Sequence, residues 1–137
     1  MSTKSIFAGI GNIQYEGPES DNPLAYRWYD ANRMVAGKTM KDQLRFAVAY
    51  WHSFCGSGAD PFGEATHLFP WLATKDAVSS AKEKMDMAFD FMTKLGLPYY
   101  CFHDVDLVDY GADVVENERR LQAITAHAKQ QQQATGI

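Results

Sequence analysis

The stretch that most constrains the fold is residues 98–106, with the sequence PYYCFHDVD. Its aromatic and apolar run is typical of a buried strand that begins after a Gly-Leu-Pro turn and ends in a histidine and two aspartates. In barrels and open α/β sheets, the reacting groups lie at the carboxyl ends of strands, because strand bodies form the core and the following loops face the ligand. The stretch therefore predicts an α/β strand with a candidate active site at its end.

The candidate catalytic residues of this stretch are His103 and Asp106, which are three residues apart. If the chain turns between them, the Asp106 carboxylate accepts a hydrogen bond from one imidazole nitrogen of His103. That bond fixes the tautomer of the ring and leaves the second nitrogen to face a substrate. The alternative is a purely structural hydrogen bond, and spacing alone leaves both interpretations open.

The elements around this strand have the order of a βαβ unit. Residues 46–51 form a continuous apolar run, typical of a strand covered on both faces, and a glycine-rich loop follows at 52–63. Residues 76–95 have a helical pattern, and a second helix is expected over about 113–133. A strand, a crossover helix and a parallel strand form a right-handed unit, so the expected fold class is α/β.

The two expected helices have recognisable ends and apolar faces. Asp76 is the expected N-cap of the first helix and Gly96 its C-terminal stop. The residues expected to be buried are Ala81, Met85, Ala88, Met92 and Leu95 in the first helix and Val114, Leu121, Ile124 and Ala128 in the second.

The first forty residues have a different character, because turn signals and aromatic side chains alternate there. They predict an irregular arm that packs on its own chain or on a partner subunit, and the sequence leaves both open. Residues 38–45 are compatible with a short helix whose buried side carries Met40 and Leu44. We therefore divide the chain into 1–45, the arm with its short helix, and 46–137, two β/α units.

Composition excludes several classes of partner. The net charge of −4 is spread along the chain without a basic stripe, so we expect no nucleic-acid partner. No run approaches the ~20 apolar residues of a membrane span, and we expect a cytoplasmic protein without a membrane partner. Cys55 and Cys101 lack the spacing of a zinc or redox motif, so we expect free thiols, with Cys101 in a buried strand.

Six blocks of sequence, in this order along the chain, resemble the long-N-terminus class of xylose isomerases. They are 15–18 (YEGP), 22–25 (NPLA), 37–40 (GKTM), 45–52 (RFAVAYWH), 60–63 (DPFG) and 100–106 (YCFHDVD). The resemblance implies a (β/α)8 TIM barrel, of which this chain would be the opening βαβα section after the N-terminal arm. It also implies a homotetramer that interconverts D-xylose with D-xylulose, and D-glucose with D-fructose, by a hydride shift. Two divalent cations, which are magnesium, manganese or cobalt, would assist that shift.

The resemblance also implies roles for individual residues. His103 would bind the ring oxygen of the cyclic sugar and assist ring opening, with Asp106 as its orienting carboxylate. Trp51 would form an apolar wall of the sugar pocket, and Phe62 would reach into the active site of a neighbouring subunit. The metal ligands of the family belong to later strands, so no metal ligand is assigned to this chain.

Length leaves more than one interpretation. A complete barrel takes ~250 residues or more, so we expect an N-terminal section whose remaining barrel is a second chain or a missing segment. The alternative is a truncated fragment without catalysis that acts through its aromatic arm and unpaired strand edges. A different barrel enzyme of the wider superfamily is a third interpretation, against which the six blocks argue.

Overall fold

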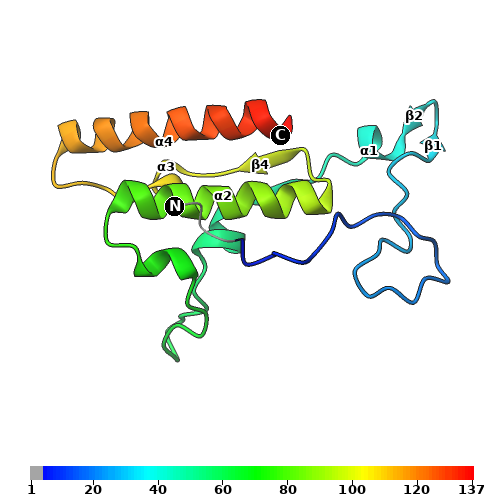
Figure 1. Cartoon of the computed structure of the whole chain (residues 1–137), viewed down its shortest axis with the longest axis horizontal. Coiled ribbons are helices and arrows are strands. Elements are labelled where there is room, and N and C mark those ends of the chain that lie inside the picture. Colours follow the sequence, from blue (N-terminus) through cyan, green and yellow to red (C-terminus); the bar gives the residue numbers. More distant parts are fainter. Residues whose placement is uncertain (1–4) are drawn as a thin grey trace.

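Two parallel strands and two long helices form the body of the chain in the computed structural model, which describes residues 5–137 (Figure 1). They are β3 (Ala47–Ala49), α2 (Ala77–Leu95), β4 (Tyr99–Cys101) and α4 (Val114–Thr135). The strands pair in parallel with Val48 opposite Tyr100, and α2 connects them. The expected order of elements and the parallel pairing are therefore confirmed, and the fold is a mixture of α and β structure.

The remaining elements are short. They are β1 (Met34–Val35), β2 (Lys38–Thr39), α1 (Met40–Gln43), the π-helical turn η1 (Trp51–Cys55), the 3-10 turn η2 (Pro70–Ala73) and α3 (Asp104–Leu107). Strands β1 and β2 form an antiparallel hairpin. Turns η1 and α3 each begin within three residues of the end of a parallel strand.

Helix α2 begins and ends where the sequence predicts. The Asp76 side chain accepts a hydrogen bond from the Ser79 backbone N–H at 2.8 Å, which satisfies one of the free donors of the first turn. Gly96 ends the helix in the left-handed conformation, with φ of 66°, which glycine adopts at little cost. The buried residues of the helix are Ala81, Met85, Met87, Ala88, Phe89 and Met92, so the expected face is confirmed except for Leu95, which is half-buried.

Helix α4 packs on α2 through its middle, not through its first turn. Ile124 is fully buried and Ala128 nearly so. Val114, expected on the same buried stripe, is instead 71% exposed. The reason is position along the axis: the first turn of α4 projects past the start of α2, so no neighbouring helix of the described residues covers it (Figure 1).

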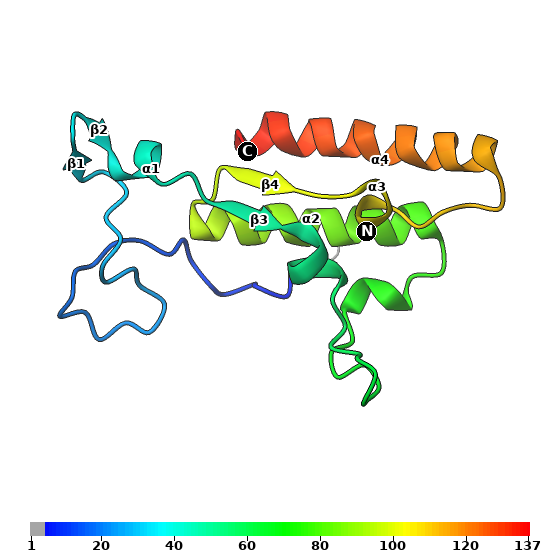
Figure 2. The same cartoon turned by 180° about the vertical axis from the view of Figure 1, so that it is seen from behind.

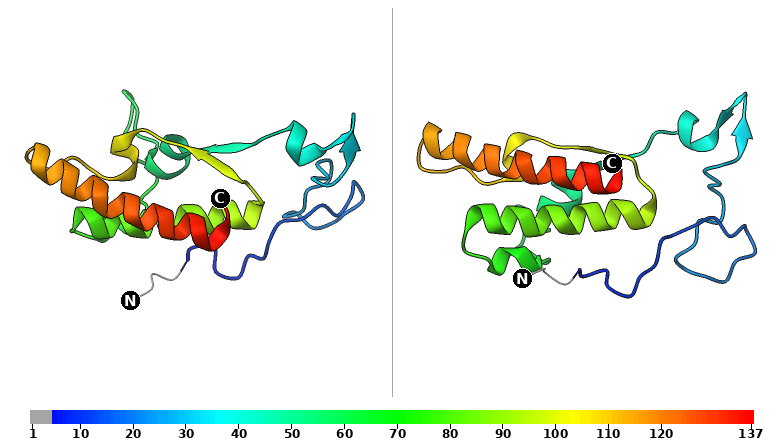
Figure 3. Two further views of the ribbon diagram at one scale, coloured as in Figure 1. Left: turned by 90° about the horizontal axis from the view of Figure 1, so that it is seen from above. Right: turned by 45° about the horizontal axis from the view of Figure 1, so that its top comes forward.

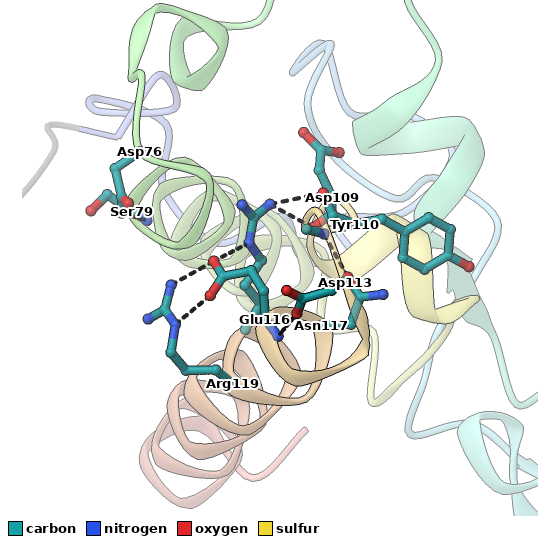
Figure 4. A network of polar contacts seen from close by, with 10 residues as sticks. Asp76, Ser79, Asp109, Tyr110, Asp113, Glu116, Asn117 and Arg119 are labelled. Carbon is teal, nitrogen blue, oxygen red and sulfur yellow. Dashed lines mark hydrogen bonds and ion pairs between the residues drawn. The ribbon is translucent and has the colours of Figure 1, made fainter.

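Polar contacts fix the connection between α3 and α4 (Figure 4). Glu116 accepts hydrogen bonds from Arg119 and Arg120, and Arg120 also donates to the carbonyls of Asp109 and Tyr110 at 3.0 Å. The two guanidinium groups lower the pKa of Glu116 from 4.5 to about 2. Because the pKa is lowered in the folded state, this stabilisation is present above pH 4.5 and is lost as the pH falls toward 2.

The two helices cover one face of the strand pair, and the other face is open. Figure 2 shows the strand pair from the side that faces away from α2 and α4. Val48 is buried, whereas Tyr99 is 49% exposed and Cys101 is exposed. The expectation of strands covered on both faces, with Cys101 buried, is therefore wrong for these residues. The reason is that α2 and α4 cover one face of this two-stranded sheet, and no element of residues 5–137 lies over the second face.

The N-terminal arm first runs along α2, where Ser5 bonds to Asp90 and the Phe7 ring meets that of Phe91, and its later part lies at the opposite end of the strands from η1 and α3 (Figure 3). Its irregular character is confirmed, because its hairpin strands have only two residues each. Tyr26 donates to the Leu95 carbonyl at 2.9 Å, which attaches the arm to the end of α2, while Trp28 is 83% exposed. The predicted buried side of the short helix is wrong, because α1 has no buried residue and Leu44 is 47% exposed. Helix α1 lies beside the β1–β2 hairpin and packs on no helix of the described chain.

A polar cluster joins the two long helices, and its loss is testable. Asp86 of α2 accepts hydrogen bonds from His127 and Gln131 of α4, each at 2.6 Å, and the His127 side chain is only 16% exposed. Asp86→Ala leaves two partly buried donors without an acceptor, so we expect the free energy of unfolding to fall by about 1–3 kcal/mol.

Urea denaturation of the purified protein measures this loss. Glu118→Ala, at an exposed position of α4, is the matched control, and we expect it to change stability by less than about 0.5 kcal/mol. Equal effects of the two substitutions would show that the cluster does not stabilise the helix pair.

Candidate active site

The predicted pair of His103 and Asp106 is formed in the structure. The Nδ1 atom of His103 lies 2.9 Å from the Oδ2 atom of Asp106, and the same oxygen accepts the backbone N–H of His103 at 2.7 Å. An ionised carboxylate only accepts, so Nδ1 carries the hydrogen and Nε2 of the neutral ring is unprotonated. The Asp106 side chain is only 9% exposed, whereas that of His103 is 65% exposed. The carboxylate is therefore held inside, and the imidazole reaches outward.

The turn that makes this contact is α3. His103 is its N-cap, with extended backbone, and Asp106 is the third residue of the helical turn. An acidic side chain at that position reaches back to the N-cap backbone N–H, as in a capping box. The same short turn that starts α3 therefore also brings the carboxylate under the imidazole.

Trp51 packs against His103, which the strand register explains. Strands β3 and β4 pair in parallel with Ala49 opposite Cys101, so Trp51 and His103 each lie two residues beyond one of a matched pair. Their rings meet with centroids 4.9 Å apart and planes inclined at 47°. The predicted pocket wall and the predicted catalytic histidine therefore share one site at the carboxyl ends of the strands.

The segment that carries Trp51 differs from the expected strand. Regular strand structure ends at Ala49, and residues Trp51–Cys55 form a π-helical turn. Short π-helical segments often occur at functional sites, because the wider turn re-aims side chains. Here the turn buries Phe54 and leaves Trp51 half-buried beside His103.

Phe62 lies on a protruding loop and not in the site of its own chain. The loop closes through backbone hydrogen bonds between Asp60 and Gly63, and the Asp60 side chain accepts the Phe62 N–H at 2.8 Å. The Phe62 side chain is 96% exposed. No ring contact joins it to Trp51 or His103 within residues 5–137, so the structure unites only three of the four residues singled out.

The structure also places a lysine under the site that sequence reasoning missed. Lys84 of α2 donates to the backbone carbonyl of Asp106 at 2.6 Å, and its Nζ atom lies 3.7 Å from the Cys55 sulfur. Its ammonium also stands 5.7 Å from the centre of the Tyr50 ring, a cation–π contact. No sequence pattern could have found it, because its main partner is a backbone carbonyl.

Two neighbours of this lysine are polar groups with raised pKa values. Burial raises the pKa of the Cys55 thiol, and the Lys84 ammonium opposes the rise, so the thiol stays protonated and donates to the Asp106 carbonyl at 3.6 Å. Burial also raises the pKa of Tyr50, whose hydroxyl has no hydrogen-bond partner among the described residues. Lys84 therefore lies half-buried among a thiol, a phenol ring and a backbone carbonyl.

The described residues offer no cluster of three or more histidine, cysteine, aspartate or glutamate side chains that could hold a metal ion. Asp106 is engaged by His103, and Asp104 accepts hydrogen bonds from the Val105 N–H and the Tyr110 hydroxyl. These two carboxylates do not by themselves form such a cluster among residues 5–137. No described helix is long and apolar enough to cross a membrane.

Comparison with known proteins gives matches over the whole chain. It is 55% identical over 137 residues to a xylose isomerase of Bacteroides thetaiotaomicron, and 56% identical over the same length to xylose isomerase 2 of Xanthomonas campestris. A xylose isomerase of Xanthomonas oryzae is 55% identical. The chain covers 31% of the length of each of these relatives.

No protein-family model matches the chain. An alignment that spans all 137 residues at 55–56% identity nevertheless confirms the resemblance seen in the six sequence blocks. By sequence, the whole chain is therefore similar to a section of these xylose isomerases that equals about a third of their length.

Proposed function

We propose that the chain is the N-terminal section of an aldose–ketose isomerase that interconverts D-xylose and D-xylulose, and that its own contribution is ring opening. The observation that carries this proposal is the imidazole of His103, which a buried carboxylate holds at Nδ1 while the side chain as a whole is 65% exposed. It stands at the carboxyl end of a parallel strand beside the ring of Trp51. That arrangement suits a proton carrier next to an apolar sugar face.

Ring opening of a cyclic aldose needs one proton to leave the anomeric hydroxyl and one to reach the ring oxygen as the C1–O bond breaks. The Nε2 atom of His103 takes the proton of the anomeric hydroxyl, and the imidazolium delivers that proton to the ring oxygen as the C1–O bond breaks. Asp106 stabilises the imidazolium and keeps the ring oriented, without itself taking the proton. Trp51 excludes water from the neighbouring face of the sugar.

The other parts of the enzyme would lie outside the described residues. The unpaired outer edges of β3 and β4 fit a sheet that continues with further strands, and their open face fits the interior of a closed sheet, as in a (β/α)8 barrel. The exposed Phe62 loop fits insertion into a neighbouring subunit of a tetramer. The divalent cations of the hydride shift would polarise the sugar oxygens, and we expect their ligands on later strands of the barrel.

The second candidate is a non-catalytic fragment that acts in assembly. The uncovered strand face and the strand edges favour it, because such surfaces bind other strands readily. The two candidates differ in whether the remaining two-thirds of the barrel accompany the chain.

One experiment separates them. The masses of all polypeptides in the purified particle, its native mass and D-xylulose formation from D-xylose with magnesium are measured together. We expect the rest of the barrel, a tetramer-sized particle and activity that EDTA abolishes and magnesium restores. A lone 15.4 kDa chain without isomerase activity would support the fragment instead.

A further inference from the structure

Lys84 contacts both turns that carry predicted site residues, η1 with Trp51 and α3 with Asp106. Among the contacts described for residues 5–137, it is the one charged side chain that does so. Its ammonium donates to the Asp106 carbonyl in α3 and approaches the Cys55 sulfur at the end of η1. It does so from the middle of α2, the most deeply buried helix of the chain. One group therefore connects the turn of His103, the turn of Trp51 and the core.

The contact with Asp106 supplies what α3 lacks. The last four carbonyls of any helix have no intrahelical partner, and α3 has only four residues. The Asp106 carbonyl is satisfied by a charge-assisted hydrogen bond of 2.6 Å, which is stronger than one between neutral groups. The backbone of Asp106 is thereby fixed, and its carboxylate in turn fixes the ring of His103.

The contact with Cys55 extends this support to the other strand end. The Cys55 thiol shares the Asp106 carbonyl with Lys84, so the end of η1 and the body of α3 meet at one oxygen atom. Trp51 begins the same turn η1 and packs on His103. A movement of Lys84 would therefore be transmitted to both members of the ring contact.

We propose that Lys84 is a positioning residue for the His103–Asp106 pair. It touches neither the imidazole nor its exposed face, and it acts through the backbone of Asp106. Its effect on turnover rests on the function proposed above, whereas its effect on the imidazole does not. Misplacement of a reacting group by about 1 Å costs up to about a hundredfold in rate, so a supporting contact of this kind has a measurable effect.

The first test is the tautomer of His103, read from the nitrogen shifts of protein labelled with ¹⁵N-histidine. We expect neutral His103 in the unsubstituted protein to be a single tautomer with hydrogen on Nδ1. In Lys84→Met, which keeps the apolar stem but no donor, we expect shifts averaged between the two tautomers. Lys84→Gln keeps a neutral donor, so we expect its nitrogen shifts to lie between those of the unsubstituted protein and those of Lys84→Met. It replaces Lys84→Met as the test variant if Lys84→Met does not fold.

The matched control is Lys82→Met, two residues earlier on the same helix, which should leave the His103 shifts unchanged. The His103 signals are assigned by their loss in His103→Asn. Unchanged tautomer shifts in a folded Lys84→Met or Lys84→Gln protein would overturn the proposal, whatever the enzyme assays show.

The second test is turnover. In the complete enzyme, we expect Lys84→Met to lower kcat on the cyclic sugar by about tenfold, while KM and turnover of sugar supplied in open-chain form change less than about twofold. Equal losses on both forms would indicate general damage and contradict a positioning role. If His103→Asn itself does not discriminate between the two forms, the proposed function fails, and the tautomer measurement still decides the role of Lys84.

Discussion

His103→Asn in the complete enzyme is expected to lower turnover of cyclic D-xylose by about 10²- to 10³-fold, the range in which a single acid–base group acts. Turnover of sugar presented in the open-chain form should fall by less than about threefold. The reason is that His103 carries the proton for ring opening at Nε2, and an open-chain substrate does not need that step. Asparagine keeps a polar side chain of similar reach but transfers no proton near neutral pH.

Steady-state rates on freshly dissolved α-anomer, and single-turnover rates on substrate in its open-chain form, measure the two effects separately. His67→Asn is the matched control, because His67 is exposed on the loop before η2 and packs on Phe69 instead of the strand ends. It should leave both rates unchanged. A similar loss on the cyclic and the open-chain sugar would remove His103 from ring opening.

Phe89→Ala is expected to destabilise the protein by about 3–5 kcal/mol, the usual cost of removing a buried phenyl ring. Phe89 of α2 is 1% exposed and meets the ring of Tyr100 edge to face, with centroids 5.4 Å apart and planes at 70°. The ring is thus the contact through which α2 holds β4. Its removal leaves a cavity beneath the strand that leads to His103.

The midpoint of urea denaturation measures this loss, with the slope of the transition checked for each variant. Val115→Ala is the control, because Val115 is 77% exposed in the first turn of α4 and should contribute less than about 0.5 kcal/mol. A cost below about 1 kcal/mol for Phe89→Ala would mean that the α2–β4 contact does not support the fold as described.

Local signals in the sequence explain which features could be predicted. Asp76 and Gly96 mark the ends of α2, because capping chemistry depends only on neighbouring residues. The bond between His103 and Asp106 was predictable for the same reason, since both partners lie in one turn. Features of this kind need no knowledge of the rest of the fold.

Features that depend on distant parts of the chain were not predictable. The apolar run after Ala49 continues through Tyr50 and Trp51, and an apolar run does not distinguish a strand from a π-helical turn. Val114 fits the buried stripe of α4, but only the offset of the two helices along their axes decides that it is exposed. The role of Lys84 depends on a backbone carbonyl 22 residues away, which leaves no trace in the pattern of side chains.

The most direct test of the central claim is a crystal structure of the complete enzyme with a cyclic, non-opening analogue of xylose. The account predicts the ring oxygen of the sugar within about 3 Å of His103 Nε2, with Nδ1 still bonded to Asp106 and the Trp51 ring against the sugar. A sugar bound away from His103, or an imidazole turned so that Nδ1 leaves Asp106, would contradict it.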